Sequence, residues 1–309
     1  MSEDIEKILK SYKSYHPSLK KDPTAFFEFS LKAAASQYYE SHFENSISIL
    51  NHCLDIKNNS LTRVETIALY SQLAIAYKAI GKYSEAKDSL NLVLKAQINL
   101  LGKENLDIAQ TYLNLADIYI MLEQFVKAEE LCKSALEILD SQLAPNNFKL
   151  VTAYKTLSLA YRYQHKFSEA MELLKHCADI EAMHLGEDNL QVSETLYYLA
   201  KLYFETDQLE DSEVLVRRVL QIRQKYYSEN HPKIAQTLNE LAIIYRNMGK
   251  HQRAETLFKQ AIDICESIYS TKHPKTLEYM ENYLTLLRLM NRLNDANTLE
   301  ESILLIKQN

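Results

Sequence analysis

Apolar residues recur along the chain at three- and four-residue spacing, in pairs of segments that are separated by short polar breaks. In the segment LNLADIYIML, which begins at Leu113, the apolar positions fall on one face of a helix. After a polar break, Ala128, Cys132, Ala135 and Leu139 form a second stripe with the same spacing. The pattern therefore predicts two antiparallel helices, a helical hairpin, over each such stretch.

The hairpin pattern repeats every 42 residues. A small residue near the start of the second helix recurs six times with this step, at Ala86, Ala128, Ala170, Ser212, Ala254 and Ala296. On the first helix, one column reads Leu73, Leu115, Leu157, Leu199, Leu241 and Tyr283, and another reads Tyr77, Tyr119, Tyr161, Tyr203, Tyr245 and Leu287. One hairpin alone buries too few apolar side chains to fold, so columns in phase predict a stack of hairpins with a continuous core.

We expect an all-α fold, a right-handed superhelical solenoid of about seven such hairpins. Residues 1–23 should form an N-terminal amphipathic helix, near Ile5 to Tyr12, and a polar linker. The array should fill 24–309, with a diverged first repeat at 24–60, regular repeats at 61–272 and a C-terminal capping repeat at 273–309. The first repeat keeps Ser46 as its small residue, and the last one has Asn291 where two others have glycine.

The columns Leu73-Ala74-x-x-Tyr77 and Ala86 match the spacing of the tetratricopeptide repeat, although that repeat is usually about 34 residues long. The links between hairpins carry LG at 101–102 and 185–186, and HP at 231–232 and 273–274. With these links and the longer unit, residues 24–307 resemble the 42-residue repeats of kinesin light chain. The resemblance implies a tetratricopeptide array.

Composition and net charge limit the classes of function that the chain can have. The net charge of −6 argues against a general nucleic-acid binder, and no run of about 18 apolar residues predicts a membrane span. Four cysteines without a CxxC pair indicate reduced core thiols, and four scattered glycines cannot build a phosphate-binding loop. His231 and His273 stand in repeat phase before proline, as link residues or helix caps. We therefore expect a cytoplasmic protein that is not an enzyme and needs no cofactor or metal.

The resemblance implies that the first helices line a concave groove. Six equivalent positions, one per repeat, are expected to face this groove, and four of them carry a cation. In relatives, an asparagine of the preceding helical turn hydrogen-bonds the backbone of a bound peptide. The candidate peptide-binding residues are Lys78, Asn114, Lys155, Arg162, Tyr197, Tyr198, Lys201, Asn239, Arg246, Asn282 and Arg288. One interpretation is a groove for an acidic segment; the other is that the cations pair with Asp117, Glu205 or Glu240 on a solvated face.

The sequence thus predicts a protein-interaction adaptor or scaffold that binds a short, possibly acidic, peptide segment in its groove. A structural subunit of a larger complex, using its convex helices, is an alternative that an exposed apolar convex patch would favour. A peptide-sensing regulator of another enzyme is a third hypothesis. The partner in each case is a protein or peptide.

Overall fold

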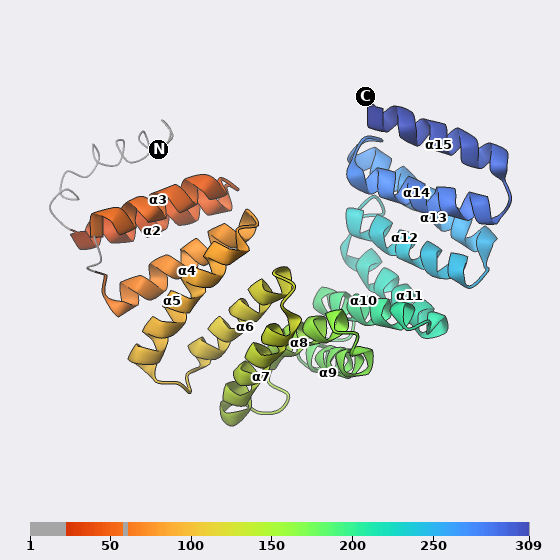
Figure 1. The fold of residues 1–309 in the computed structure, drawn as a ribbon. Coiled ribbons are helices and arrows are strands. Elements are labelled where there is room, and N and C mark those ends of the chain that lie inside the picture. The colour runs from red at the N-terminus through yellow and green to blue at the C-terminus, as the bar shows by residue number, and fades with distance from the viewer. Residues whose placement is uncertain (1–22, 58–60, 309) are drawn as a thin grey trace. The chain divides into compact units, whose positions relative to one another are not determined.

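The computed structural model describes residues 23–57 and 61–308, and within these ranges every regular element is a helix. The expected helix near Ile5 to Tyr12 and the polar linker before residue 23 lie outside the described residues. Figure 1 shows the described helices, α2 to α15, following one another along the chain.

The chain divides into two compact units, Met1–Gln164 and His165–Asn309, which are described here as unit 1 and unit 2. The helices of unit 1 are α2 (Pro23–Tyr39), α3 (Phe43–Lys57), α4 (Arg63–Ala79), α5 (Tyr83–Leu101), α6 (Leu106–Met121), α7 (Phe125–Gln142) and α8 (Leu150–Tyr163). The helices of unit 2 are α9 (Phe167–Leu185), α10 (Leu190–Glu205), α11 (Leu209–Tyr226), α12 (Pro232–Asn247), α13 (His251–Ile268), α14 (Pro274–Leu289) and α15 (Leu293–Gln308).

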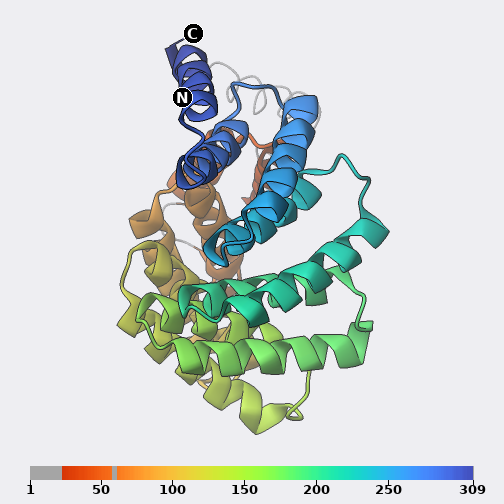
Figure 2. The ribbon, with the colours of Figure 1, turned by 90° about the vertical axis from the view of Figure 1, so that its right-hand side faces the viewer.

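Each unit is a stack of antiparallel hairpins in chain order. In unit 1 the hairpins are α2–α3, α4–α5 and α6–α7, and α8 packs on α7. In unit 2, α9 packs on α10 and is followed by the hairpins α10–α11, α12–α13 and α14–α15. Figure 2 shows this antiparallel pairing clearly for α10 and α11. The all-helical repeat fold predicted from the 42-residue period is thereby confirmed.

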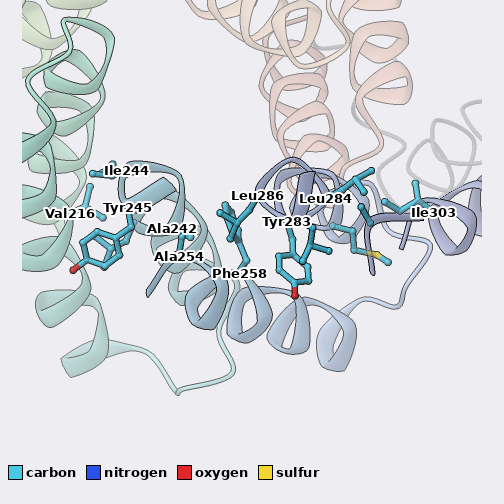
Figure 3. Packing of buried hydrophobic residues seen from close by; sticks show 14 of the residues in the cluster. Val216, Ala242, Ile244, Tyr245, Ala254, Phe258, Tyr283, Leu284, Leu286 and Ile303 are labelled. Carbon is cyan, nitrogen blue, oxygen red and sulfur yellow. The ribbon is translucent and has the colours of Figure 1, made fainter. Parts of the chain in front are cut away.

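The repeat columns form the cores of the units. Every member of the small-residue column is at most 1% exposed, and every member of the leucine column is at most 9% exposed. Small side chains at the helix crossing let two backbones approach closely, and the leucine then packs beside the gap. Figure 3 shows this in unit 2, where Ala242 lies near Ala254 and Phe258 lies beside Leu286.

The tyrosine column lies at the edge of this core. Tyr245 is 7% exposed, and its hydroxyl donates a hydrogen bond to Glu213 Oε1 at 3.1 Å. Tyr77, Tyr119, Tyr161 and Tyr203 are half-buried. The Tyr77 hydroxyl accepts a 3.5 Å hydrogen bond from Asn51 Nδ2, so at Tyr77 and Tyr245 the ring contributes apolar contact area while the hydroxyl reaches a polar group.

The turn inside each hairpin requires a left-handed residue. The backbone φ angles at this column are 75° at Gly81, 57° at Glu123, 59° at His165, 59° at Asp207, 72° at Gly249 and 55° at Asn291. Glycine adopts this conformation without steric cost, whereas other L-residues are strained. Only two of the six positions carry the residue that the turn favours.

The links between hairpins provide helix caps in another repeat column. Asn105 and Asn189 accept a hydrogen bond from the backbone N–H two residues later, at 2.8 and 2.9 Å. His231 and His273 do the same through Nδ1, at 3.1 and 3.2 Å, and their rings stack on tyrosine. The expectation that these histidines cap helices is confirmed, because their side chains satisfy free N–H groups in the first turn.

Candidate functional site

The candidate residues lie on the first helices of both units. Unit 1 carries Lys78 on α4, Asn114 on α6, and Lys155 and Arg162 on α8. Unit 2 carries Tyr197, Tyr198 and Lys201 on α10, Asn239 and Arg246 on α12, and Asn282 and Arg288 on α14. Each unit therefore has its own candidate surface.

In unit 1 the candidate cations are engaged within the chain. Lys78 forms an ion pair with Asp117, which belongs to the first helix of the next hairpin. The guanidinium of Arg162 lies over the ring of Tyr163, 5.7 Å from its centroid. Lys155 is half-buried on α8. Lys78 thus fits the interpretation in which the cations of the first helices pair with acidic residues of the chain.

Asn114, the candidate asparagine of unit 1, is exposed. Its Oδ1 accepts a hydrogen bond from Gln110 Nε2 at 3.1 Å, one turn earlier on α6. Its amide nitrogen remains a donor for a partner on the same face. The proposed role of Asn114 in binding a peptide backbone stays a prediction.

In unit 2, Tyr197 is a core residue and has little surface to offer a peptide. It is 5% exposed, and its hydroxyl donates a 2.7 Å hydrogen bond to Glu240 Oε1. Its ring lies between two cations, with Lys201 Nζ 5.4 Å and the Arg223 guanidinium 5.0 Å from the centroid. Burial, followed by the charge of Glu240, raises the pKa of the Tyr197 phenol, so the hydroxyl stays a donor. By contrast, the neighbouring Tyr198 is 48% exposed.

Asn239 is also buried, at 3% exposure. Its Oδ1 accepts a hydrogen bond from Asn282 Nδ2 at 3.2 Å, which joins α12 to α14. Asn239 is buried for the same reason as Tyr197. Each lies one position before a residue that is expected to face the groove, and its side chain points toward the first helix of the next hairpin. The half-buried Asn282 is the member of this pair that reaches the surface.

The cations of unit 2 differ in how their charge is compensated. Lys201 Nζ lies 3.7 Å from Glu240 Oε1, and Arg288 Nη2 lies 2.6 Å from Glu300 Oε2. Arg246 forms no ion pair with any carboxylate of the described residues, and its Nη1 donates only a long 3.4 Å hydrogen bond to the Asn282 carbonyl. Burial lowers the pKa of this guanidinium, because the charged form has lost part of its hydration.

Sequence reasoning missed a buried arginine beneath this surface. Arg223 is fully buried on α11, where it donates to Glu194 Oε1 at 2.9 Å and to Thr237 Oγ1 at 2.8 Å. Glu194 also pairs with Lys233 at 3.1 Å. The only sequence signal was its position in the apolar stripe of α11, next to Ile222.

A small recess opens between α10 and α12, with α11 behind it. Its cavity volume is about 30 Å³, and its apolar wall includes Ala200, Phe204, Val216 and Ile244. Lys201 and Glu240, whose ion pair spans the two helices, are among its polar lining residues.

Metal-ligating side chains and cysteines of the described residues do not gather into a site. The described residues contain no group of three or more histidine, cysteine, aspartate or glutamate residues that could hold a metal ion. All four cysteines are buried free thiols, as predicted, and burial raises the pKa of Cys132 to about 12. Such a thiol is not ionised near neutral pH and is a poor nucleophile. None of the described helices combines the length and the apolar character that crossing a membrane requires.

A family model described as tetratricopeptide repeat matches residues 107–180, 191–267 and 233–308, which together make up more than half of the chain. The chain belongs to the tetratricopeptide repeat family. Members of this family are built from stacked helical hairpins, as both units are. No curated protein matched the sequence.

Solved structures extend the likeness in fold. The tetratricopeptide-like repeats of a putative kinesin light chain from Podospora anserina are 24% identical, with a TM-score of 0.60, over 66% of this chain and 97% of that one. BtubC (BKLC) from P. vanneervenii is 21% identical, with a TM-score of 0.61, over 80% and 94%. The apo quorum sensor NprR from B. thuringiensis is 10% identical, with a TM-score of 0.62, over 98% and 94%. The expected similarity to kinesin light chain repeats is confirmed at the level of fold.

Proposed function

We propose that this tetratricopeptide protein is a non-catalytic adaptor whose unit 2 binds a segment of another polypeptide on its first helices. A carboxylate of the segment would pair with Arg246. The observation that carries the proposal is the half-buried guanidinium of Arg246, which no carboxylate of the described residues neutralises. A buried charge normally has a partner, so this one favours an anionic ligand.

The proposal assigns the binding of the carboxylate to Arg246 alone and not to a continuous row of cations. Lys78, Lys201 and Arg288 already have carboxylate partners within the chain, and a ligand would have to displace those. Arg246 requires no such exchange. A charge-assisted hydrogen bond to a partly desolvated arginine contributes roughly 1.5–3 kcal/mol. We therefore expect one acidic residue of the segment to dominate its recognition.

Polar and aromatic groups beside Arg246 suit the rest of a peptide. Asn282, whose carbonyl accepts from Arg246, also has a side-chain amide that can bind a peptide backbone. Tyr198, 48% exposed on α10, offers flat contact area at low entropic cost. Stacked repeats commonly use such extended first-helix surfaces for binding. The free cysteines support a reducing, cytoplasmic setting.

The alternative of a subunit that uses its outer helices has weaker support. The exposed apolar residues of the second helices include Leu92 on α5, Val126 on α7 and Val214 on α11, which are 42%, 60% and 65% exposed. Further ones are Leu100 and Leu101 at the end of α5 and Leu304 and Leu305 near the end of α15, so part of this exposed apolar area lies at helix ends. The likeness in fold to the quorum sensor NprR leaves the regulator hypothesis open as a subtype of peptide binding.

A site-specific crosslink tests the proposal. A photoreactive phenylalanine analogue in place of Tyr198 should capture a partner in the native cell, and mass spectrometry should map the crosslink to a segment with an acidic residue. A synthetic peptide of that segment should bind the purified chain, and Arg246→Ala should weaken its affinity by roughly 10- to 150-fold.

Arg288→Ala is the matched control, because Arg288 holds the same repeat position one hairpin later and is paired with Glu300. This variant should change the affinity less than about threefold. Raising the salt concentration should weaken wild-type binding, because salt screens the attraction between exposed charges over about 8–10 Å. Equal affinities for the wild type and Arg246→Ala would refute the carboxylate anchor.

A further inference from the structure

The wall of the recess between α10 and α12 contains a residue that is smaller than its counterparts in the two flanking repeats. Val216 lies on α11 in the wall of the cavity and is 2% exposed. One repeat later the same position holds Phe258, which is fully buried against Leu286, the counterpart of Ile244. One repeat earlier it holds Leu174, which is 3% exposed. A shorter side chain between larger counterparts leaves unfilled space at a helix crossing.

The unfilled volume matches a small side-chain group. The cavity of about 30 Å³ is large enough for one water molecule or a group of similar size. Ala200, Phe204 and Ile244 give it an apolar wall, so a water inside could bond only to the polar groups of the lining. A methyl group would regain the dispersion contacts that the wall now lacks.

The polar part of the lining is rigidly held. Glu240 Oε1 accepts from the buried Tyr197 hydroxyl at 2.7 Å and lies 3.7 Å from Lys201 Nζ. Both charged residues keep part of their side chains exposed, 25% for Glu240 and 38% for Lys201. They therefore lie where the recess meets the surface. An apolar interior with a few fixed polar groups is the usual make-up of a binding pocket.

We infer that this recess is a subsite for a small aliphatic side chain, of alanine or valine size, from the segment that Arg246 anchors. The inference rests on the proposed function. Glu240 and Arg246 are six residues apart on α12, which corresponds to about 9 Å along a helix. An extended peptide covers that distance in about three residues. The bound segment therefore carries its aliphatic residue within about three positions of its acidic one.

Position 216 offers a graded test. Val216→Leu restores the residue of the preceding repeat and fills the recess by one methylene, whereas Val216→Ala enlarges it. The biotinylated full chain, as wild type, Val216→Leu, Val216→Ala and Arg246→Ala, is used to select binders from a random peptide library displayed on phage. Circular dichroism confirms that each variant keeps its helical content before selection.

The wild type should enrich peptides with alanine or valine at a fixed offset from aspartate or glutamate. Val216→Leu should lose the aliphatic preference and bind the best wild-type peptide about tenfold more weakly. Val216→Ala should shift the preference toward leucine and methionine, a gain that poor folding cannot produce. Arg246→Ala should lose the acidic preference, and the peptides that it still enriches should keep the aliphatic one.

The outcomes separate the two ideas. If every variant at position 216 selects the same aliphatic residue as the wild type, or none, while the acidic preference persists, then the recess is not a subsite and the proposed function stands. If the wild type enriches no peptide above the streptavidin background, then peptide binding by unit 2 is wrong and the subsite falls with it.

Discussion

The left-handed turn column allows a sharp test of how this repeat stores backbone strain. Glu123 connects α6 to α7 with a φ of 57°, where Gly81 has 75° in the preceding hairpin. A left-handed conformation costs an L-residue roughly 1–2 kcal/mol. Introducing glycine costs roughly 0.4–1 kcal/mol through the greater freedom of the unfolded chain. The balance predicts that Glu123→Gly stabilises unit 1 by roughly 0.5–1 kcal/mol.

Gly249 provides the reverse experiment in unit 2. A Cβ added there would meet no atom within 4 Å, so Gly249→Ala introduces no clash and reports the same balance, between the left-handed cost at a φ of 72° and the freedom of glycine in the unfolded chain. We expect this substitution to destabilise unit 2 by roughly 1 kcal/mol. Asp207→Gly should give a smaller gain than Glu123→Gly, because aspartate tolerates the left-handed region better than glutamate.

Urea unfolding, followed by circular dichroism at 222 nm, measures each change as a shift in midpoint at constant slope. Proteolysis with peptide mapping assigns each transition to its unit, because the two units need not unfold together. If Glu123→Gly lowered the stability of unit 1 while Gly249→Ala left unit 2 unchanged, the strain assigned to this column would not exist.

Three further substitutions test the packing and electrostatics. Ala128→Leu should overpack a fully buried helix crossing and cost roughly 1–3 kcal/mol in thermal unfolding; an unchanged melting temperature would contradict that packing. Arg223→Met should cost roughly 1–3 kcal/mol, because Thr237 loses a donor and Glu194 keeps only Lys233 as its partner, and Glu194→Gln added to it should restore part of that loss. Hydrogen bonds from Lys259 first, and then from Arg292, lower the pKa of Glu255 to about 2. The stability that this carboxylate contributes is therefore fully present above pH about 4.5 and is lost as the pH falls toward 2. Glu255→Gln should lower the free energy of unfolding by on the order of 1 kcal/mol at pH 7, and thermal melts at lower pH should show a progressively smaller loss.

The repeat, its helices and their caps could be predicted from the sequence because their causes are local and periodic. A helix face needs only three- and four-residue spacing, and the column from Ala86 to Ala296 marks one crossing in every hairpin. Their position before proline made His231 and His273 link residues or helix caps, and the structure shows caps, which bond to N–H groups two residues away. The boundary between the units at Gln164 was not predicted, because every column continues across it.

The candidate site was predictable only as a set of positions on the first helices. Whether a cation there is available depends on partners from other hairpins, 39 residues away for Lys78 and Asp117 and 36 residues away for Arg246 and Asn282. No local pattern encodes such distances. The same holds for the burial of Tyr197, which follows from its contact with Glu240, 43 residues later.

Tertiary packing also decided where the surface is hollow. In the sequence, Val216 is one more apolar residue in a helical stripe, as suitable there as Leu174 or Phe258. Its short side chain becomes a recess only where α10, α11 and α12 meet, because a void is defined by the atoms on its far side. Periodicity thus determined which residues face inward, whereas the contacts between hairpins decided which charges are compensated and which space is left for a ligand.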